Sequence, residues 1–140
     1  MKKEFTSYSV EETEMIAREL APNLKKGDFV AMYGDLGVGK TAFVRALASV
    51  LAKAATVKSP TYTIVNEYKG EGINIYHFDV YRIEDDDDLY SVGFYDYLKK
   101  GICVCEWSEN IPWAIPIDAV KVTIMRDGEN ANQRKIIIEA

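Results

Sequence analysis

The sequence predicts an α/β protein with three layers, in which helices cover both faces of a mixed β-sheet. The first observation is a short, nearly unbroken apolar run at Phe29–Tyr33, typical of a strand whose two faces are both buried. The second is a helical pattern over Thr41–Leu51, and the third is a series of strand-like and helix-like segments that continues to Glu139. With 140 residues, of which 48% are hydrophobic, we expect a single domain over residues 1–140 with one core.

The N-terminal part is expected to form a helix that leads into the strand at Phe29–Tyr33. Ser9 and Glu12 have the spacing of a capping box, which opens a helix. Apolar residues recur every four positions behind it, at Ile16, Leu20 and Leu24. Pro22 is expected to fray the end of this helix, and a turn at 25–28 follows.

The C-terminal part is expected to form two hairpins, a broken helical region and one more strand. Tyr62–Tyr68 and Ile73–Phe78 are rich in β-branched and aromatic residues, which predicts the first hairpin. The later segments are predicted as a helical region at Asp85–Lys100 broken at Gly93, a strand at Ile102–Glu106, a short helix at Glu109–Ile115, and a final hairpin of Lys121–Met125 and Lys135–Glu139 around an Asp-Gly turn.

The charge and the cysteines exclude several classes of protein. The chain has 17 Lys and Arg against 22 Asp and Glu, a net charge of −5, which disfavours autonomous nucleic-acid binding. No apolar stretch approaches the roughly 20 residues that span a bilayer, and the first residues lack the apolar region of a secretory signal, so we expect a soluble, cytoplasmic protein. Cys103 and Cys105 are expected to be reduced strand residues rather than metal ligands or a disulfide.

The segment Gly34–Thr41, GDLGVGKT, matches the phosphate-binding motif GxxxxGK[ST] and lies between a predicted strand and a predicted helix, as that motif requires. Its glycines let the backbone curl around a polyphosphate with N–H groups pointing inward. Lys40 is expected to act as the catalytic charge on the β- and γ-phosphates, and the hydroxyl of Thr41 to coordinate Mg²⁺. The motif therefore predicts a P-loop NTPase-like fold that binds a nucleoside triphosphate with Mg²⁺. The residues expected to contact the nucleotide are Asp35, Leu36, Gly37, Val38, Gly39, Lys40, Thr41 and Ala42.

A second, acidic ligand is needed to fix Mg²⁺ beside the phosphates. Two predicted strands end in candidates, Asp79 and Glu106, and the sequence alone does not rank them. We expect Asp79 to hold the metal, directly or through water, and Glu106 to orient the attacking water or to complete the metal's surroundings. The alternative that one of the two is an ordinary carboxylate at the end of a strand stays open.

Motifs that the chain lacks favour ATP as the triphosphate and hydrolysis as the reaction. The NKxD segment of guanine-specific proteins and the LSGGQ-like signature of transporter ATPases are both missing. A kinase lid usually supplies several arginines, and the chain has Arg18, Arg45, Arg82, Arg126 and Arg134. Of these, only Arg82 adjoins a candidate catalytic segment, so a small-molecule phosphotransferase is disfavoured.

Four motifs in order resemble the TsaE (YjeE) family of small ATPases of tRNA threonylcarbamoyladenosine biosynthesis. They are the loop Gly34–Thr41, the segment Ser59–Thr63, the segment His77–Arg82, and Glu106 with Trp107. Two positions are worth comparing: Ala42 stands where the family usually has Thr, and Ser108 stands where the family varies. Neither removes a metal or phosphate ligand.

The resemblance implies a Mg-dependent ATPase that works with TsaD and TsaB to modify the adenosine next to the anticodon of ANN-reading tRNAs. Partner proteins would activate its hydrolysis of ATP and would hold the tRNA, so that this chain meets tRNA only indirectly. The resemblance also implies that Ser59–Thr63 is a switch-like loop near the γ-phosphate, that Thr61 contacts the nucleotide, and that Trp107 lies close to it.

Several assignments stay open on the sequence. The chain could instead be a nucleotide-gated interaction module, in which ATP binding sets a docking surface and hydrolysis is incidental. His77, the only histidine, is as compatible with a structural role as with the site. Tyr81 and Arg82 are expected to brace the loop or to meet a partner. The acidic run at 84–88 is interpreted as a solvated helix start rather than a docking patch.

Overall fold

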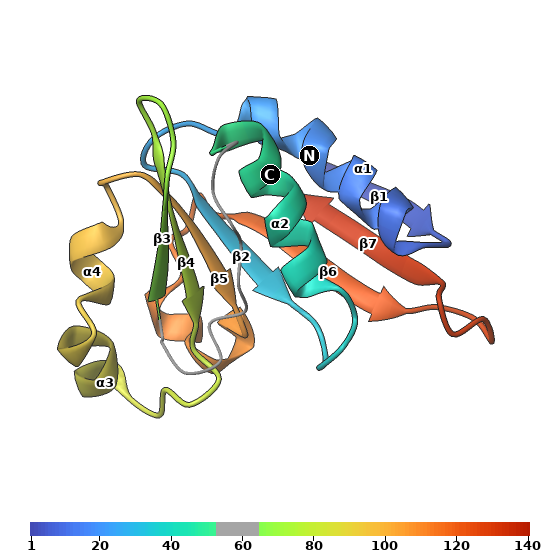
Figure 1. Ribbon diagram of the computed structural model, residues 1–140. Coiled ribbons are helices and arrows are strands. Elements are labelled where there is room, and N and C mark those ends of the chain that lie inside the picture. The colour runs from blue at the N-terminus through green and yellow to red at the C-terminus, as the bar shows by residue number, and fades with distance from the viewer. Residues whose placement is uncertain (53–64) are drawn as a thin grey trace.

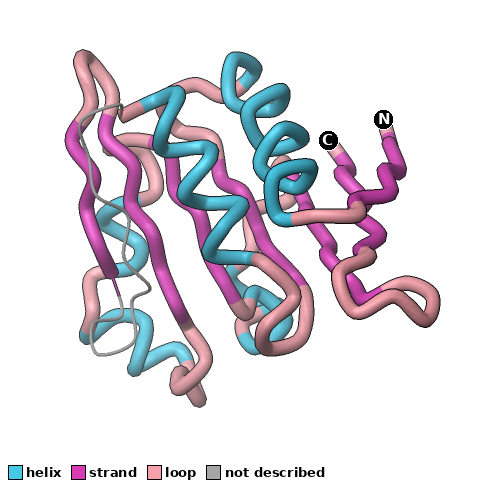
Figure 2. The backbone as a smooth tube through the Cα atoms, turned by 45° about the vertical axis from the view of Figure 1, so that its right-hand side comes forward, coloured by secondary structure: helices cyan, strands magenta, loops and turns pink. Residues whose placement is uncertain are grey.

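A seven-stranded sheet lies between two layers of helices in the computed structural model, which describes residues 1–52 and 65–140 (Figures 1 and 2). The strands are β1 (Lys2–Ser7), β2 (Phe29–Tyr33), β3 (Val65–Lys69), β4 (Asn74–Asp79), β5 (Ile102–Glu106), β6 (Val120–Arg126) and β7 (Arg134–Glu139). The α-helices are α1 (Val10–Leu20), α2 (Lys40–Leu51), α3 (Asp86–Ser91) and α4 (Phe94–Tyr97), and short 3₁₀-helices cover Ala21–Asn23, Ser108–Asn110 and Pro112–Ala114.

The sheet is mixed, and its parallel strands form the centre. The strand order is β1-β7-β6-β2-β5-β4-β3, in which β2 pairs in parallel with β5 and β6, and β4 pairs in parallel with β5. The outer pairs β3·β4, β6·β7 and β1·β7 are antiparallel. The predicted three-layer α/β architecture with a mixed sheet is therefore confirmed. The carboxyl ends of β2, β4 and β5 lie at one edge of the sheet, which is where parallel α/β folds place their ligands.

The two faces of the sheet carry separate cores. Along β2, Val30 and Met32 pack under α1 and α2, whereas Phe29 and Ala31 face the layer that contains α3 and α4. All four side chains are buried, which explains the unbroken apolar run in the sequence. Cys103 and Cys105 share the second face, are free thiols and are buried, so the prediction of reduced strand residues is confirmed.

Local signals placed most helix starts correctly. The Ser9 side chain caps α1 by accepting a hydrogen bond from the Glu12 amide at 3.1 Å, as the capping box predicts. The acidic run opens α3, with Asp85 as its N-cap. Gly93, at a φ of 75°, separates α3 from α4.

One strand was missed, and one predicted helix was wrong. The strand β1 was not predicted, because it is a charged edge strand with mostly exposed side chains and so lacks an apolar pattern. The helix expected at 109–115 is two 3₁₀ turns, since Pro112 removes an amide that a continuous helix would use. The final hairpin is confirmed: its loop covers residues 127–133, and each strand extends one residue further towards the loop than predicted. The start of the predicted strand at 62–68 lies partly outside the described residues.

Within the part of the chain that the structure describes, none of the helices has the length and apolar character needed to cross a membrane.

Candidate functional site

The segment that connects β2 to α2 has the backbone of an anion cradle. Gly39, at a φ of 115°, is the N-cap of α2 and turns the chain into the helix through a left-handed conformation. Gly34 approaches a neighbouring strand so closely that a Cβ there would lie 2.5 Å from the carbonyl oxygen of Ile124. The loop therefore ends on the N-terminus of a helix whose first amides have no intrahelical acceptor, which is an arrangement that attracts phosphate.

Lys40 places its ammonium group inside this loop. Its Nζ donates a hydrogen bond of 2.5 Å to the carbonyl of Gly34 and lies 3.6 Å from the centre of the Trp107 ring. Only 5% of the residue is exposed. Burial lowers the pKa of Lys40, and the nearby carboxylates, led by Glu106, oppose that shift. A charge that is held away from water in this way is stabilised by an anion that enters the loop.

Asp79 and Glu106 are brought together by the pairing of β4 with β5. They are direct neighbours in the parallel register, so their side chains leave the sheet on the same side, towards α2. The Asp79 Oδ1 accepts a hydrogen bond of 3.0 Å from the amide of Tyr81. Burial raises the pKa of Asp79, and the charge of Glu106 raises it further. The two carboxylates share one corner of the site, which the sequence could propose but not place.

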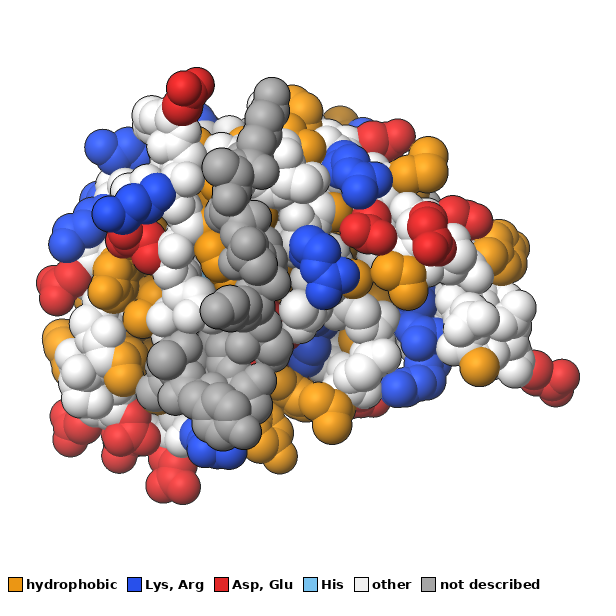
Figure 3. Space-filling view, in the orientation of Figure 1, with side chains coloured by type: hydrophobic (Ala, Val, Ile, Leu, Met, Phe, Trp, Pro, Cys, Tyr) orange, Lys and Arg blue, Asp and Glu red, His pale blue; other side chains and the backbone are white. Residues whose placement is uncertain are grey.

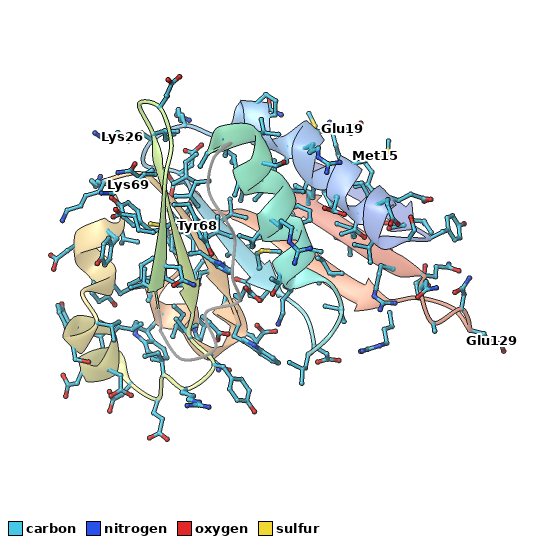
Figure 4. The ribbon with its side chains drawn as sticks, viewed as in Figure 1. Met15, Glu19, Lys26, Tyr68, Lys69 and Glu129 are labelled. Atoms are coloured by element: carbon cyan, nitrogen blue, oxygen red, sulfur yellow. The ribbon has the colours of Figure 1, made fainter. Side chains whose placement is uncertain are left out.

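His77 holds one oxygen of Glu106. Its Nε2 lies 2.5 Å from Glu106 Oε2, and its Nδ1 lies 3.2 Å from the hydroxyl of Tyr68, which is labelled in Figure 4. His77 is fully buried. A neutral His77 that accepts from Tyr68 at Nδ1 carries its proton on Nε2 and donates it to the carboxylate. The structure thus places His77 against a candidate site residue, and it adds Tyr68, which the sequence reasoning missed.

The segment after β5 contacts both the phosphate-binding loop and the residues that follow β4. Trp107 adopts a left-handed φ of 63°, and its ring lies 4.9 Å from that of Tyr81. Two residues that the sequence reasoning missed continue the connection. Glu109 accepts a hydrogen bond of 3.2 Å from the amide of Gly34, and Asn110 donates to the carbonyls of Val80 and Tyr81 at 3.3 and 3.0 Å. No local sequence signal marks either residue, because both act through segments distant in the chain.

The other residues predicted to contact the nucleotide differ in burial and in position. Thr41 lies in the first turn of α2, and Asp35 and Leu36 are exposed in the loop. Val38 points into the core instead, so only its backbone can face a nucleotide. Arg82 is exposed. Ser59–Thr63, with Thr61, lie outside the described residues.

The expectation that Arg82 alone adjoins a candidate catalytic segment was wrong. Arg126 and Arg134 both donate hydrogen bonds to carbonyls of the loop, at Leu36 and Val38 respectively. The sequence alone does not show these contacts, because they depend on the sheet order, in which β6 lies next to β2 and β7 lies next to β6.

A small cavity lies on the outer side of the loop. Its volume is about 90 Å³, and it is bounded by the loop, the first turn of α1 and the connection between β6 and β7. Gly39 and Ala42 line it from the loop side, and Asn132 lines it from the opposite side. This cavity adjoins the end of the loop that leads into α2.

The donors gathered here suit a magnesium polyphosphate. Hard oxygen ligands are available from Thr41, Asp79 and Glu106, and Mg²⁺ prefers such ligands in combination with phosphate oxygens. Among residues 1–52 and 65–140, no group of three or more His, Cys, Asp or Glu side chains could hold a metal by itself. Backbone amides and Lys40 supply the positive side of the site.

Comparison with known proteins identifies relatives along nearly the whole chain. The family model described as "Threonylcarbamoyl adenosine biosynthesis protein TsaE" matches residues 7–136. The tRNA threonylcarbamoyladenosine biosynthesis protein TsaE of Bacillus subtilis is 37% identical over 124 residues, which are 88% of this chain and 77% of that protein. The Haemophilus influenzae protein of the same name is 42% identical over 101 residues, 71% of this chain and 64% of that protein. The crystal structure of Bacillus subtilis YdiB matches with a TM-score of 0.80 at 31% identity, covering 99% of this chain and 84% of that chain.

Proposed function

This chain belongs to the TsaE family of tRNA threonylcarbamoyladenosine biosynthesis and has its P-loop fold, and we propose that it is a Mg-dependent ATPase subunit that acts with TsaD and TsaB. The observation that carries the proposal is the position of Lys40. Its buried ammonium lies inside a loop of backbone amides, at the end of the sheet where Asp79 and Glu106 are register neighbours, and the charges of both carboxylates act on its pKa.

Binding of ATP is proposed because the hydrogen-bond and ring partners of Lys40 in the loop are not anions. Lys40 uses the carbonyl of Gly34 and the face of Trp107 as partners, and neither carries a full negative charge. The β- and γ-phosphates of ATP would replace these partners, while the amides at 37–41 surround the phosphate oxygens. The cavity beside Ala42 would then receive part of the nucleoside, because it adjoins the end of the loop that follows the phosphates.

Hydrolysis is assigned to the two carboxylates according to the oxygens that make no hydrogen bond within residues 1–52 and 65–140. Glu106 Oε2 is taken by His77, which leaves Oε1 to orient the attacking water and to accept its proton. Asp79 Oδ1 is taken by the amide of Tyr81, which leaves Oδ2 to reach the metal, directly or through water. Mg²⁺ held by Thr41 and Asp79 would neutralise charge on the phosphates as the terminal bond breaks.

The biological setting is proposed from the family and from the charge of the chain. With a net charge of −5, this protein is a poor partner for tRNA alone, so TsaD and TsaB would hold the ANN-reading tRNA in the cytoplasm. Leu36 and Tyr81 are 79% and 60% exposed near the loop, which suits a site that a partner protein covers and activates.

Single-turnover phosphate release tests the proposal, with the protein in excess over ATP and with TsaB and TsaD present. Glu106→Gln and Asp79→Asn are expected to bind Mg-ATP and to slow phosphate release by about 100-fold or more, because they act on the transition state. Glu19→Gln is the matched control: it also removes one carboxylate, on the exposed side of α1, far from the loop (Figure 4). Wild-type release rates in both site variants would refute the assignment, and a wild-type protein that never releases phosphate would refute the ATPase itself.

A further inference from the structure

Two arginines of neighbouring strands hold the outer side of the phosphate-binding loop. Arg126 ends β6, Arg134 begins β7, and the two are direct partners in the antiparallel register. Arg126 Nη2 donates to the carbonyl of Leu36 at 3.2 Å, and Arg134 Nε donates to the carbonyl of Val38 at 3.0 Å. Figure 3 shows Lys and Arg side chains gathered between the end of α2 that carries the loop and the β6–β7 connection.

The position of these carbonyls determines where the next amides point. A trans peptide is planar, so the carbonyl of one residue and the N–H of the following residue point in opposite directions. A guanidinium that holds the carbonyl of Leu36 outward therefore directs the N–H of Gly37 inward. The contact at Val38 does the same for Gly39. Both glycines have positive φ, at 79° and 115°, as the alternating backbone of an anion-binding nest requires.

Arg134 also fixes the distance between the hairpin and the loop. Its Nη1 donates to the carbonyls of Ala131 and Gln133, at 2.7 and 2.9 Å, while its Nε reaches Val38. The planar guanidinium thus joins the β6–β7 connection to the loop as one rigid unit. Arg126 packs against Gly37, since a Cβ on that glycine would lie 3.4 Å from Nη2 of Arg126.

The charges of this pair are not neutralised nearby. Like charges directly opposite each other in a sheet are unfavourable. In the described part of the chain, neither guanidinium makes a salt bridge with a carboxylate. Two unneutralised cations beside one loop raise its positive potential, which suits a highly charged anion such as a nucleoside triphosphate.

We propose that Arg126 and Arg134 are positioning residues for nucleotide binding, which hold the peptides of Leu36 and Val38 so that the amides of Gly37 and Gly39 already face the phosphates. The inference rests on the proposed nucleotide-binding function. Both arginines act through the loop backbone. Arg134 also lines the small cavity beside Ala42, so Arg126 is the residue whose replacement reports the backbone contact alone.

Backbone 15N relaxation of the free protein tests the clamp without any nucleotide. In Arg126→Met and Arg134→Met, the order parameters of the loop amides at 37–41 are expected to fall from the rigid value of about 0.85 to about 0.6 or lower, while those of β2 and β5 keep their wild-type values. Lys135→Met is the matched control, because Lys135 follows Arg134 on β7 and pairs with Glu4 at 3.7 Å instead of the loop. Unchanged order parameters at 37–41 in both arginine variants would overturn the proposal.

Calorimetric titration with Mg-ATP supplies the second readout. Each arginine variant is expected to bind roughly tenfold or more weakly, with Lys135→Met within about twofold of wild type. Arg126→Lys and Arg134→Lys keep the positive charge but lose the guanidinium. If both bind Mg-ATP with wild-type affinity, or if Lys135→Met weakens binding equally, the arginines act only through their charge, and the positioning role is overturned. Arg126 is exposed, so its variant is expected to fold even if that of Arg134 does not. A wild-type protein without affinity for Mg-ATP would refute the proposed function, whereas the order parameters of the loop amides would still decide the clamp.

Discussion

The buried contact between His77 and Glu106 determines which carboxylate oxygen of Glu106 remains available to the site. Nε2 of His77 is hydrogen-bonded to Oε2 of Glu106, and Nδ1, the opposite ring nitrogen, is hydrogen-bonded to the hydroxyl of Tyr68. Residues that orient a reacting carboxylate in this way contribute to the rate without touching the substrate. His77 is therefore a positioning residue for Glu106.

Replacement of His77 is expected to separate hydrolysis from binding. His77→Leu should slow single-turnover phosphate release about 10- to 100-fold and leave the Kd for Mg-ATP within about threefold, because Glu106 loses its orientation and not its charge. His77→Gln retains an N–H donor at similar reach and should restore most of the rate. If both variants lose only thermal stability and keep the wild-type release rate per folded molecule, His77 is structural.

The role of His77 could not be predicted from the sequence. Its identity as the only histidine is visible in the chain, but its contact with Glu106 follows from the register that sets His77 opposite Val104 on the next strand. Arg126 and Arg134 were missed for the same reason. Sequence patterns identify residues by local spacing, whereas these contacts depend on which strands are neighbours.

Among the elements, β5 shows most clearly how burial sets chemistry. All of its residues are buried, and its two thiols face the core on the side of α3 and α4. Burial raises the pKa of Cys103 to about 12 and raises the pKa of Cys105 as well. A thiol with a raised pKa stays protonated at neutral pH, so neither cysteine is expected to act as a nucleophile or a metal ligand in the folded protein.

Thiol titration with an aromatic disulfide checks this expectation. At pH 8 a thiol of pKa about 12 is ionised in about one molecule in ten thousand, against about one in ten at the ordinary value of 9.0, so the native protein should react slowly. Both thiols should react at once in denaturant, and native reactivity should rise as the pH approaches 12. Rapid reaction of either thiol in native protein at pH 8 would contradict a fully packed β5.

The sequence predicted the strands whose two faces are both buried, which gives an apolar run, and the helices whose first residues carry a recognisable motif. The strands β2 and β5 have buried residues on both sides, and α2 follows a motif that ends in a helix start. The edge strand β1 leaves no such signature, because its pairing with β7 satisfies its backbone while its side chains stay in water. The 3₁₀ turns after β5 were mistaken for one helix, although Pro112, which begins the second turn, lacks the amide that a continuous helix would use.

On the scale of the whole molecule, the order of the strands assembles the site. The connections after β2, β4 and β5 leave the same edge of the sheet, so residues 34–41, 79–82 and 106–110 meet there although they are far apart in the chain. The fold class could be predicted because the P-loop motif fixes one strand, one loop and one helix. The exact neighbours of the loop could not, because β6 and β7 come last in the chain and the sheet places β6 next to β2 and β7 next to β6.

Charge is also distributed across the molecule as a whole. Acidic side chains gather at the end that carries α3 (Figure 3), where Asp86, Asp87 and Asp88 form the first helical turn. Lys26 and Lys69 lie at the opposite edge of the sheet from the phosphate-binding loop (Figure 4). Lys26 and Lys69 are thus remote from the site, whereas Lys40, Arg126 and Arg134 contact the loop itself.

The most direct test of whether this loop binds a polyphosphate is a titration of the free protein with Mg-ATP. Binding is followed by calorimetry and by the backbone amide NMR signals of residues 37–41. Wild-type protein should bind one ATP, with the largest signal changes at 37–41, and at a ligand concentration of about 100 times the Kd its free energy of unfolding should rise by about 2.7 kcal/mol. Lys40→Met should lose at least about 1.5 kcal/mol of binding free energy, because it removes the only side-chain cation placed inside the loop in the described structure. Binding of equal strength in Lys40→Met, or saturation without any change at 37–41, would contradict the assignment of the site.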